Sequence, residues 1–328
     1  MATKTVIEAV RDAMHEEMSR DQNVLVMGED IAERGGVFLA TDGFVDDFGP
    51  ARVIDTPLAE SSIAGIALGA AVNGLRPIAE IEFADFIWPA MNQIVGEASK
   101  VRYGTKGKKQ APMVVRMPYG GGVRGGLYHS QSIDVVFAHQ PGLHVVAPST
   151  PYDAKGLLKS AIRSDDPVVF LEHKRTYRLV RGEVPDQEYT LPIGVADVKR
   201  EGSDLTIVAF GLMVHYCLEA ANTVAESDGI DTEIVDLRSL TPLDRDTILN
   251  SVRKTSKALV VQEDSLSYGV GAEIAATIAT EAFEDLDAPV ARLAGPDLPE
   301  MPFSPALEAE YMLSPEKIVT AIRNLAAY

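Results

Sequence analysis

Cysteine and long hydrophobic runs are scarce in this chain, and each shortage excludes a class of protein. Cys217 is the only cysteine, so no internal disulfide can form, which fits a reducing cytoplasm. No run of about 18 or more apolar residues occurs, so we expect no membrane-spanning helix. The N-terminal segment MATKTVIEAVRDAMHEE has no signal-peptide core and is typical of an amphipathic helix. These features predict a cytoplasmic protein.

Positive charge is also in short supply. Lysine and arginine number 30 against 48 aspartates and glutamates, which gives a net charge of −18. A protein that binds the nucleic-acid backbone needs a basic excess to neutralise phosphates, so we expect no nucleic-acid partner. The six histidines show no spacing typical of a zinc site.

Strand-like and helical stretches alternate along the 328 residues, which are enough for two domains of ordinary size. This alternation predicts α/β domains with mainly parallel sheets. A polar segment at 173–192 interrupts the pattern, so we place one domain at 1–185 and a second at 190–328. The first domain's expected strands are 24–27, 53–55, 77–81, 113–117, 144–147 and 168–172, with long helices after Glu60 and over 85–103.

Glu60 is the most informative single residue. It opens the stretch 61–73, SSIAGIALGAAVN, which is rich in alanine and glycine and carries no charge. Such a helix is expected to be buried against close neighbours. A carboxylate at its first turn is stabilised by the helix N-terminus and can be engaged by a donor at the edge of a dry interior. The alternative is a helix-start glutamate that only satisfies local amides.

A glycine-rich loop precedes His129 and Ser130 in the segment GGGVRGGLYHSQS. Glycines allow close approaches that other residues prevent, so the loop can bring His129 against a cofactor or another chain. The alternative is a histidine held structurally by the loop. After HSQS the chain continues with Ile133 and Asp134.

These segments, taken in order, resemble a known family. VLVMGEDIAERGGVF, RVIDTPLAE, FADFIWPAMNQIVGEASKVRY, GGLYHSQS and PGLHVVAPSTPYDAKGLLKSAIRSDDPVVFLE are similar to the beta subunit of the thiamine-diphosphate-dependent, decarboxylating component of 2-oxo acid dehydrogenase complexes. IVDLRSLTPLD and GVGAEIA match more loosely. The resemblance implies a transketolase-type pyrimidine-binding domain followed by a transketolase C-terminal-like domain.

The resemblance also implies roles for particular residues. Glu60 in DTPLAE matches the glutamate that holds the aminopyrimidine of thiamine diphosphate in its reactive form. Leu58 matches the position whose backbone lies near the pyrimidine. Phe86 matches the aromatic that stacks on the ring, although a core aromatic is the alternative. His129 matches the histidine that faces the incoming lipoyl group, where an imidazole can move a proton near neutral pH.

The family's diphosphate motif, GDG followed by paired asparagines, does not occur in this sequence. The resemblance therefore implies an alpha subunit that holds Mg²⁺ and the diphosphate in an α2β2 heterotetramer. It further implies a lipoyl-bearing acyltransferase core as partner, with Asp297 as a candidate docking contact. Backbone carbonyls around Ala161, Ser164 and Asp166 are implied as ligands of a monovalent cation, K⁺.

Three other functions fit the sequence less well. A dinucleotide-binding oxidoreductase is disfavoured because the third glycine of the fingerprint that begins at Gly269 and Gly271 is Ile274. A complete transketolase-like enzyme is disfavoured by the missing GDG. A non-catalytic scaffold or regulatory paralogue is disfavoured because Glu60 and His129 are both present. The substrate stays open between pyruvate and branched-chain 2-oxo acids.

Overall fold

The computed structural model describes residues 1–328, and their contacts divide the chain into two units. Unit 1 comprises residues 1–119 and 136–193, and unit 2 comprises 120–135 and 194–328. The predicted domains, 1–185 and 190–328, assign the glycine-rich segment to the first domain, whereas the contacts group it with unit 2. The reason is that its backbone is hydrogen-bonded to side chains of the C-terminal part, Glu263 and Glu308.

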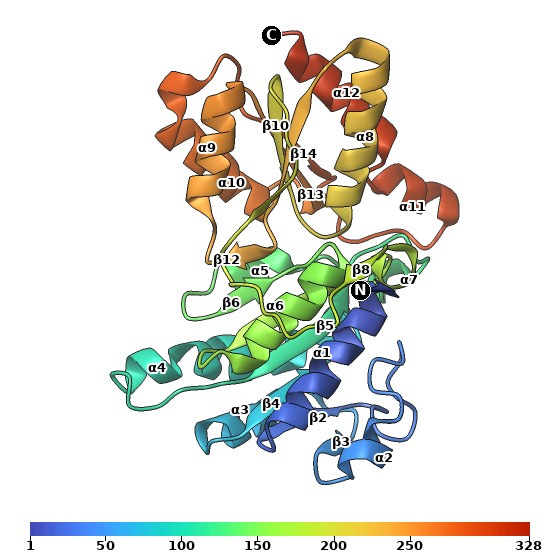
Figure 1. The fold of residues 1–328 in the computed structure, drawn as a ribbon, viewed down its shortest axis with the longest axis vertical. Helices are drawn as coiled ribbons and strands as arrows, with labels where there is room; N and C mark the ends of the chain where they lie inside the picture. Colours follow the sequence, from blue (N-terminus) through green and yellow to red (C-terminus); the bar gives the residue numbers. More distant parts are fainter. The chain divides into compact units, whose positions relative to one another are not determined.

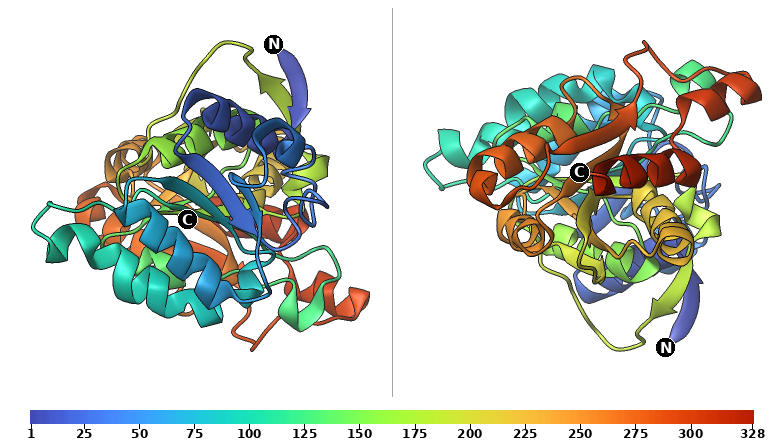
Figure 2. Two further views of the ribbon diagram at one scale, coloured as in Figure 1. Left: turned by 90° about the horizontal axis from the view of Figure 1, so that it is seen from below. Right: turned by 90° about the horizontal axis from the view of Figure 1, so that it is seen from above.

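Unit 1 is built around a parallel sheet in the order β6-β7-β5-β4-β2-β3 (Figure 1). Every strand of this order that sequence patterning predicts is present within about two residues of its expected bounds. The strands are β2 (Val24–Gly28), β3 (Val53–Asp55), β4 (Arg76–Glu80), β5 (Val114–Tyr119), β6 (His144–Val146) and β7 (Val168–His173). A separate antiparallel pair joins β1 (Ala2–Thr5) to β8 (Arg181–Val184), and the two strands lie side by side in Figure 2.

The helices of unit 1 begin at residues that satisfy exposed backbone N–H groups. Thr5 and Glu8 form a capping box at the start of α1, and Thr150 caps α6 just before Pro151. Helices α1 and α6 pack against each other and contribute to one hydrophobic core with the sheet. The helices are α1 (Val6–Arg20), α2 (Phe44–Phe48), α3 (Glu60–Val72), α4 (Val101–Gly104), α6 (Pro151–Arg163) and α7 (Thr176–Leu179), while α5 (Asp134–Ala138) spans the junction with unit 2.

The long helix expected over 85–103 is broken in the structure. The chain there passes through short 3₁₀ turns, a π-helical stretch at Asn92–Glu97 and then α4. Pro89 and Gly96 lie within the segment, and neither residue favours a regular helix interior. The irregular segment packs against α3, so it borders the helix that begins at Glu60.

Unit 2 contains a second sheet in the order β14-β13-β10-β11-β9, in which only β9 runs antiparallel. The prediction of two α/β domains with mainly parallel sheets is therefore confirmed. The strands of this sheet are β9 (Asp197–Arg200), β10 (Leu205–Ala209), β11 (Thr232–Asp236), β13 (Ala258–Ser265) and β14 (Ala291–Gly295), and the short strand β12 (Ser239–Thr241) is not part of it. The helices are α8 (Leu212–Asp228), α9 (Arg245–Thr255), α10 (Val270–Glu281), α11 (Pro305–Tyr311) and α12 (Pro315–Ala326).

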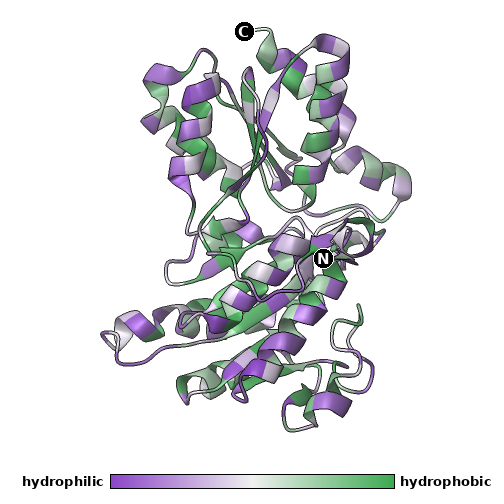
Figure 3. Cartoon of the chain, viewed as in Figure 1, coloured by the Kyte–Doolittle hydropathy of each residue, from purple (hydrophilic) through white to green (hydrophobic).

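Hydrophobic residues of unit 2 meet in a core of their own, to which α8, α12 and the sheet contribute. Helices of both units carry hydrophobic and hydrophilic residues along their length, as Figure 3 shows, which is the pattern of helices with one buried face. No helix of either unit has the length and apolar character that crossing a bilayer requires.

Candidate active site

Glu60 is the first residue of α3, as the sequence predicts. The N-cap residue, Ala59, has no side-chain oxygen that could accept a hydrogen bond from the first N–H groups of the helix. Glu60 is the acidic residue of the first turn. Glu60 is only 9% exposed, yet its side chain makes no hydrogen bond within the chain. The alternative in which Glu60 satisfies local amides therefore has no hydrogen bond to support it. The Glu60 oxygens keep some exposed surface, so a donor from another molecule can reach them.

Two further glutamates, which sequence reasoning missed, belong to the same edge of the sheet. Glu29 directly follows β2, and Glu82 lies two residues after the end of β4. Burial, together with the charges of Glu82, Glu60 and Asp30, raises the pKa of Glu29 to about 7. Burial and the charges of Asp30, Glu80 and Glu60 also raise the pKa of Glu82. The sequence could have indicated both residues, because each carboxylate follows a buried strand closely, at the carboxyl edge where parallel sheets bind ligands.

Leu58 and Phe86 belong to unit 1, as Glu60 does. Leu58 lies on the segment between β3 and α3 and is 79% exposed, so a large apolar side chain is left open next to Glu60. Phe86 is half-buried on a 3₁₀ turn after β4, and its ring meets the edge of Phe83 at 5.7 Å between centroids. Between Leu58 and β3, the Thr56 hydroxyl oxygen is buried without a hydrogen-bond partner. The sheet edge thus combines apolar side chains with unsatisfied polar atoms.

A buried ionic network lies inside this sheet edge. Arg116 on β5 is 1% exposed and donates to Glu80 on β4 at 2.6 Å and to both carboxylate oxygens of Glu172 on β7 at 2.6 and 2.8 Å. The Tyr177 hydroxyl donates to Glu172 at 2.7 Å. Burial by itself lowers the pKa of Arg116. The negative charges of Glu172 and Glu80 raise the pKa by more, so it lies above its usual value. The guanidinium therefore stays charged and fixes three neighbouring strands.

Replacing Arg116 with methionine is expected to destabilise the protein by about 3–5 kcal/mol, because two buried carboxylates lose their cation. Arg34→Met serves as the control, since Arg34 pairs with Asp30 on the surface and such pairs contribute about 0–1 kcal/mol. Urea unfolding of both variants measures the difference. A loss for Arg116→Met no larger than that of the control would contradict this account of the network.

His129 belongs to unit 2 and is exposed on the glycine-rich segment. It follows a short 3₁₀ turn at Gly126–Tyr128. A Cβ added at Gly125 would lie 2.5 Å from the carbonyl oxygen of His129 and 2.7 Å from its Cβ, so only glycine permits this packing. The structure thus groups Glu60, Leu58 and Phe86 in unit 1 and His129 in unit 2. The glycine-rich loop does allow a close approach of Gly125 to His129 that a larger residue would prevent.

Two carboxyl groups lie next to each other where the glycine-rich segment ends. Asp134, the first residue of α5, is fully buried beside Asp264 on β13. Burial and the charge of Asp264 raise the pKa of Asp134 well above its usual range. Burial and the charge of Glu263 also raise the pKa of Asp264, to about 6, although the hydrogen bond from the Ser265 N–H lowers it. Each carboxyl of the pair therefore binds a proton more readily than an exposed aspartate does.

Because the folded-state pKa of Asp264 is raised, its contribution to stability is complete below about pH 4 and is lost as the pH rises through about 6. Asp264→Asn removes this titration. We expect the variant to gain about 1–3 kcal/mol relative to the parent on going from pH 4 to pH 8. Urea unfolding at both pH values, with exposed Asp287→Asn as control, measures the change. An unchanged difference between the two pH values would contradict the pKa assignment.

The residues predicted to hold a monovalent cation are already engaged with the protein. The Ala161 carbonyl accepts the Ser164 N–H at 3.2 Å, and the Ser164 carbonyl accepts a guanidinium N–H of Arg76 at 2.9 Å. The carboxylate of Asp166 pairs with Arg102. A cation bound to the Ser164 carbonyl would therefore share that oxygen with the Arg76 guanidinium.

Asp297, the predicted docking contact, is exposed in unit 2. Its carboxylate accepts the backbone N–H of Ser267 at 2.9 Å and the Ser267 hydroxyl at 2.6 Å. These hydrogen bonds lower its pKa. The side chain is therefore a fixed negative charge on the surface.

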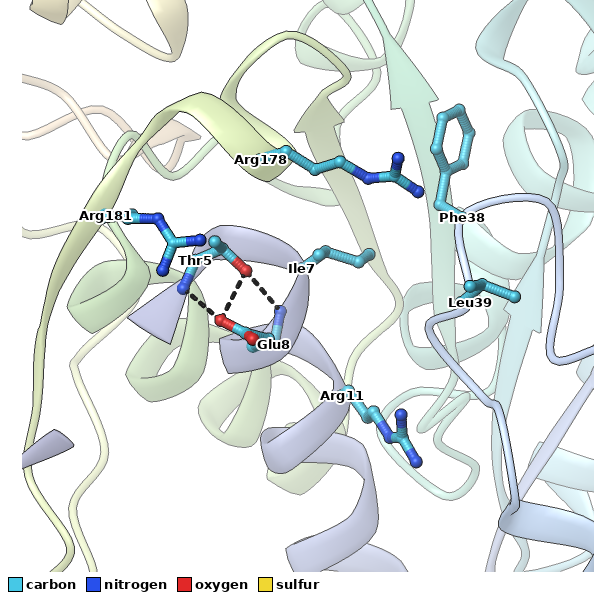
Figure 4. Close-up of a pocket in the computed structure, with 8 residues that line it drawn as sticks. All are labelled: Thr5, Ile7, Glu8, Arg11, Phe38, Leu39, Arg178 and Arg181. Atoms are coloured by element: carbon cyan, nitrogen blue, oxygen red, sulfur yellow. Dashed lines mark hydrogen bonds between the residues drawn. The ribbon is translucent and has the colours of Figure 1, made fainter. Parts of the chain in front are cut away.

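A cavity of about 320 Å³ in unit 1 is lined by none of the predicted site residues. It lies where β1 meets α1, and Figure 4 shows three arginine side chains around it together with the Thr5–Glu8 capping box. Its lining residues are Thr5, Ile7, Glu8, Arg11, Phe38, Leu39, Arg178 and Arg181. The cavity is thus separate from the acidic edge that contains Glu60.

Comparison with known proteins agrees with the two-unit fold. Residues 2–180 match the transketolase pyrimidine binding domain, and residues 194–318 match the transketolase C-terminal domain. A solved structure described as a split gene transketolase, inactive beta4 tetramer, superposes with a TM-score of 0.80 at 24% identity, covering 99% of this chain and 98% of that chain. At this identity the likeness concerns the fold.

Sequence relatives are much closer. The chain is 55% identical to the 2-oxoisovalerate dehydrogenase subunit beta of Bacillus subtilis, with 100% of both chains covered. It is 49% identical to the pyruvate dehydrogenase E1 component subunit beta of the same organism, again with 100% of both covered. The corresponding pyruvate dehydrogenase subunit of Staphylococcus epidermidis is 47% identical, over 97% of this chain and 96% of the relative.

Proposed function

The chain belongs to the family of beta subunits of 2-oxo acid dehydrogenase E1 components, which use thiamine diphosphate, and from that premise we propose its individual roles. We propose that it binds the aminopyrimidine half of thiamine diphosphate at the edge of the unit 1 sheet. The observation that carries this proposal is the nearly buried Glu60 carboxylate without a hydrogen-bond donor of its own. The enzyme decarboxylates a 2-oxo acid and transfers the acyl group to lipoyl.

The residues at the sheet edge fit a flat heteroaromatic ring with protonated nitrogen. When bound, thiamine diphosphate supplies the carbanion chemistry that makes decarboxylation feasible. Glu60 accepts a hydrogen bond from the pyrimidine ring nitrogen and thereby holds a proton on it. Glu29 and Glu82 concentrate negative charge nearby, which favours protonation of that nitrogen. Phe86 and the exposed Leu58 offer apolar surface to the ring faces.

His129 is proposed to act later, during transfer of the acyl group to lipoyl. An exposed imidazole can donate or accept a proton near neutral pH at the reacting sulfur. It belongs to a loop of unit 2, whereas Glu60 belongs to unit 1. Decarboxylation, which breaks a carbon–carbon bond, and acyl transfer, which forms a carbon–sulfur bond, are thus assigned to different residues of the chain.

The diphosphate half of the site is proposed to come from an alpha subunit. This chain has no GDG motif, and it contains no cluster of three or more His, Cys, Asp or Glu suited to a metal ion. We therefore assign Mg²⁺ to the partner, within an α2β2 heterotetramer. Asp297, a fixed negative charge, is proposed to contact the basic binding domain of the acyltransferase core. A K⁺ site is proposed at the backbone carbonyls around Ala161, Ser164 and Asp166, where the Ser164 carbonyl also accepts a hydrogen bond from Arg76.

A branched-chain 2-oxo acid is the substrate that we favour. The relative named for 2-oxoisovalerate is 55% identical, against 49% for the pyruvate relative of the same organism. Pyruvate is the second candidate because that identity is also high. The test is to purify the chain alone and together with its alpha subunit, and to measure dye-linked decarboxylation of both acids with thiamine diphosphate and Mg²⁺.

We expect activity only in the pair, with 3-methyl-2-oxobutanoate preferred over pyruvate in kcat/KM. Activity of the chain alone would refute the half-site assignment. A preference for pyruvate would refute the substrate assignment and leave the half-site intact.

A further inference from the structure

The glycine-rich segment that carries His129, residues 120–135, is a closed loop in unit 2. The N–H of Gly120 donates to the carbonyl of Gln131 at 2.9 Å, so the two limbs of the loop meet at their base. His129 lies between these two anchor points in sequence. Its imidazole can be held in one orientation only if the limbs of the loop are themselves fixed.

One carboxylate oxygen fixes both limbs. Oε1 of Glu263, on β13, accepts the N–H of Gly121 at 2.7 Å and the hydroxyl of Ser132 at 3.0 Å. Glu263 is 6% exposed, so the two hydrogen bonds are shielded from water. Hydrogen bonds from neutral donors to a buried carboxylate are stronger than those between neutral groups. Glu263 therefore links the entry and the exit of the loop.

A second carboxylate holds the middle of the entry limb. Oε1 of Glu308, on α11, accepts the N–H of Arg124 at 3.0 Å. Arg124 has a φ of 61°, which is uncommon for a residue with a side chain. Glu308 is buried although the neighbouring residues of α11 are exposed. The hydrogen bond thus compensates for a strained backbone five residues before His129.

Close packing supports the same points. A Cβ at Gly121 would lie 2.2 Å from the sulfur and the terminal carbon of Met301, so this limb lies directly on the Met301 side chain. Gly126, at a φ of 63°, would bring a Cβ to within 3.0 Å of Phe303. The loop therefore rests on the segment between β14 and α11 on one side and is tied by Glu263 and Glu308.

We propose that Glu263 and Glu308 are positioning residues that hold the His129 loop in the conformation required for acyl transfer. The inference rests on the proposed role of His129 and gives the C-terminal domain a part in catalysis beyond partner docking. Neither carboxylate touches the reacting atoms; each acts through the loop backbone. Misplacing a catalytic group by about 1 Å can cost about a hundredfold in rate, so loss of a tether should be measurable.

The first test uses limited trypsin digestion of the full chain, read by mass spectrometry. The chain contains two Arg-Gly-Gly sequences in loops, at Arg124 inside the tethered loop and at Arg34 in unit 1, so the second is an internal reference. Glu263→Ala and Glu308→Ala are expected to accelerate cleavage after Arg124 at least fivefold and to leave cleavage after Arg34 unchanged. Glu310→Ala, at an exposed position on α11, should change neither.

Glu263→Gln keeps one acceptor oxygen and should restore most of the protection, which separates loss of the hydrogen bonds from loss of the charge. If cleavage after Arg124 is unchanged in both alanine variants, the tethers do not restrain the loop and the inference is wrong. Should the Glu263→Ala chain not fold, Glu308→Ala and Glu263→Gln still decide the outcome.

The second test measures two rates in the complex with the alpha subunit. Both alanine variants should lose at least tenfold in acylation of a lipoyl domain while dye-linked decarboxylation stays within about threefold. The positioning role would be wrong if His129→Ala loses acylation but the two alanine variants, although cleaved faster by trypsin, acylate the lipoyl domain at the normal rate. If His129→Ala itself keeps full acylation, the proposed role of His129 fails and this inference fails with it, whereas the digestion result continues to report on the tethers.

Discussion

Glu60→Gln is expected to abolish nearly all 2-oxo acid decarboxylation by the complex with the alpha subunit. The amide has the same shape but carries no negative charge, so it cannot stabilise a protonated ring nitrogen in the bound cofactor. Proton transfer by a positioned side chain contributes about 10²- to 10⁴-fold, and we expect a loss of kcat in that range. Steady-state rates with an artificial electron acceptor at saturating thiamine diphosphate measure it.

Stability provides an independent reading of the same substitution. Glu60 is nearly buried and makes no hydrogen bond within the chain, so removing its charge breaks no internal contact. We expect Glu60→Gln to be at least as stable as the parent in urea unfolding. Glu33→Gln, an exposed glutamate of the same unit, should keep full activity. A Glu60→Gln enzyme with activity close to that of Glu33→Gln would refute the assignment.

The position of Glu60 also explains why its neighbours matter. Glu29 has a pKa of about 7 because it is buried close to Glu82 and Glu60, so it is partly protonated at neutral pH. A site with excess negative charge lowers the cost of placing a protonated heterocycle there. This electrostatic setting is a property of three strand ends brought together by the fold. It is not visible in any one of the three sequence segments.

Sequence patterning predicts the regular parts of the fold well. Buried strands such as β2 and β7 are short apolar runs, and α6 begins with Thr150 and Pro151, a strong start signal. It fails at 85–103, where periodicity favours one helix but Pro89 and Gly96 lie inside it. It also fails to predict β9, an edge strand with polar alternation that is confined to four residues.

At the candidate site, the sequence reveals residues that differ from their neighbours along the chain, but it does not reveal residues that matter through long-range contacts. Glu60 stands out because the helix behind it is otherwise uncharged, and the glycines around His129 mark an unusual loop. Glu263 and Glu308 leave no such mark, because their significance depends on contacts with residues more than 100 positions away. The sequence also does not predict that residues 120–135 belong with the C-terminal part, because no change in composition marks either end of that segment.

His129→Ala is expected to separate the two half-reactions. Dye-linked decarboxylation should fall by no more than about threefold, because that step does not need the histidine. Acylation of a lipoyl domain should fall by about 100-fold, which is at the lower end of what a general acid or base contributes. Single-turnover measurements of each half-reaction give the two numbers separately.

The control for this comparison is His139→Ala, an exposed histidine that follows α5 and lies outside the glycine-rich loop. It should leave both half-reactions unchanged. Equal losses of decarboxylation and acylation in His129→Ala would place the histidine in cofactor binding or in a step common to both. A selective loss of acylation would mean that unit 2 supplies the acyl-transfer chemistry and unit 1 supplies the carboxylate for decarboxylation. The two functions would then follow the two units into which the contacts divide the chain.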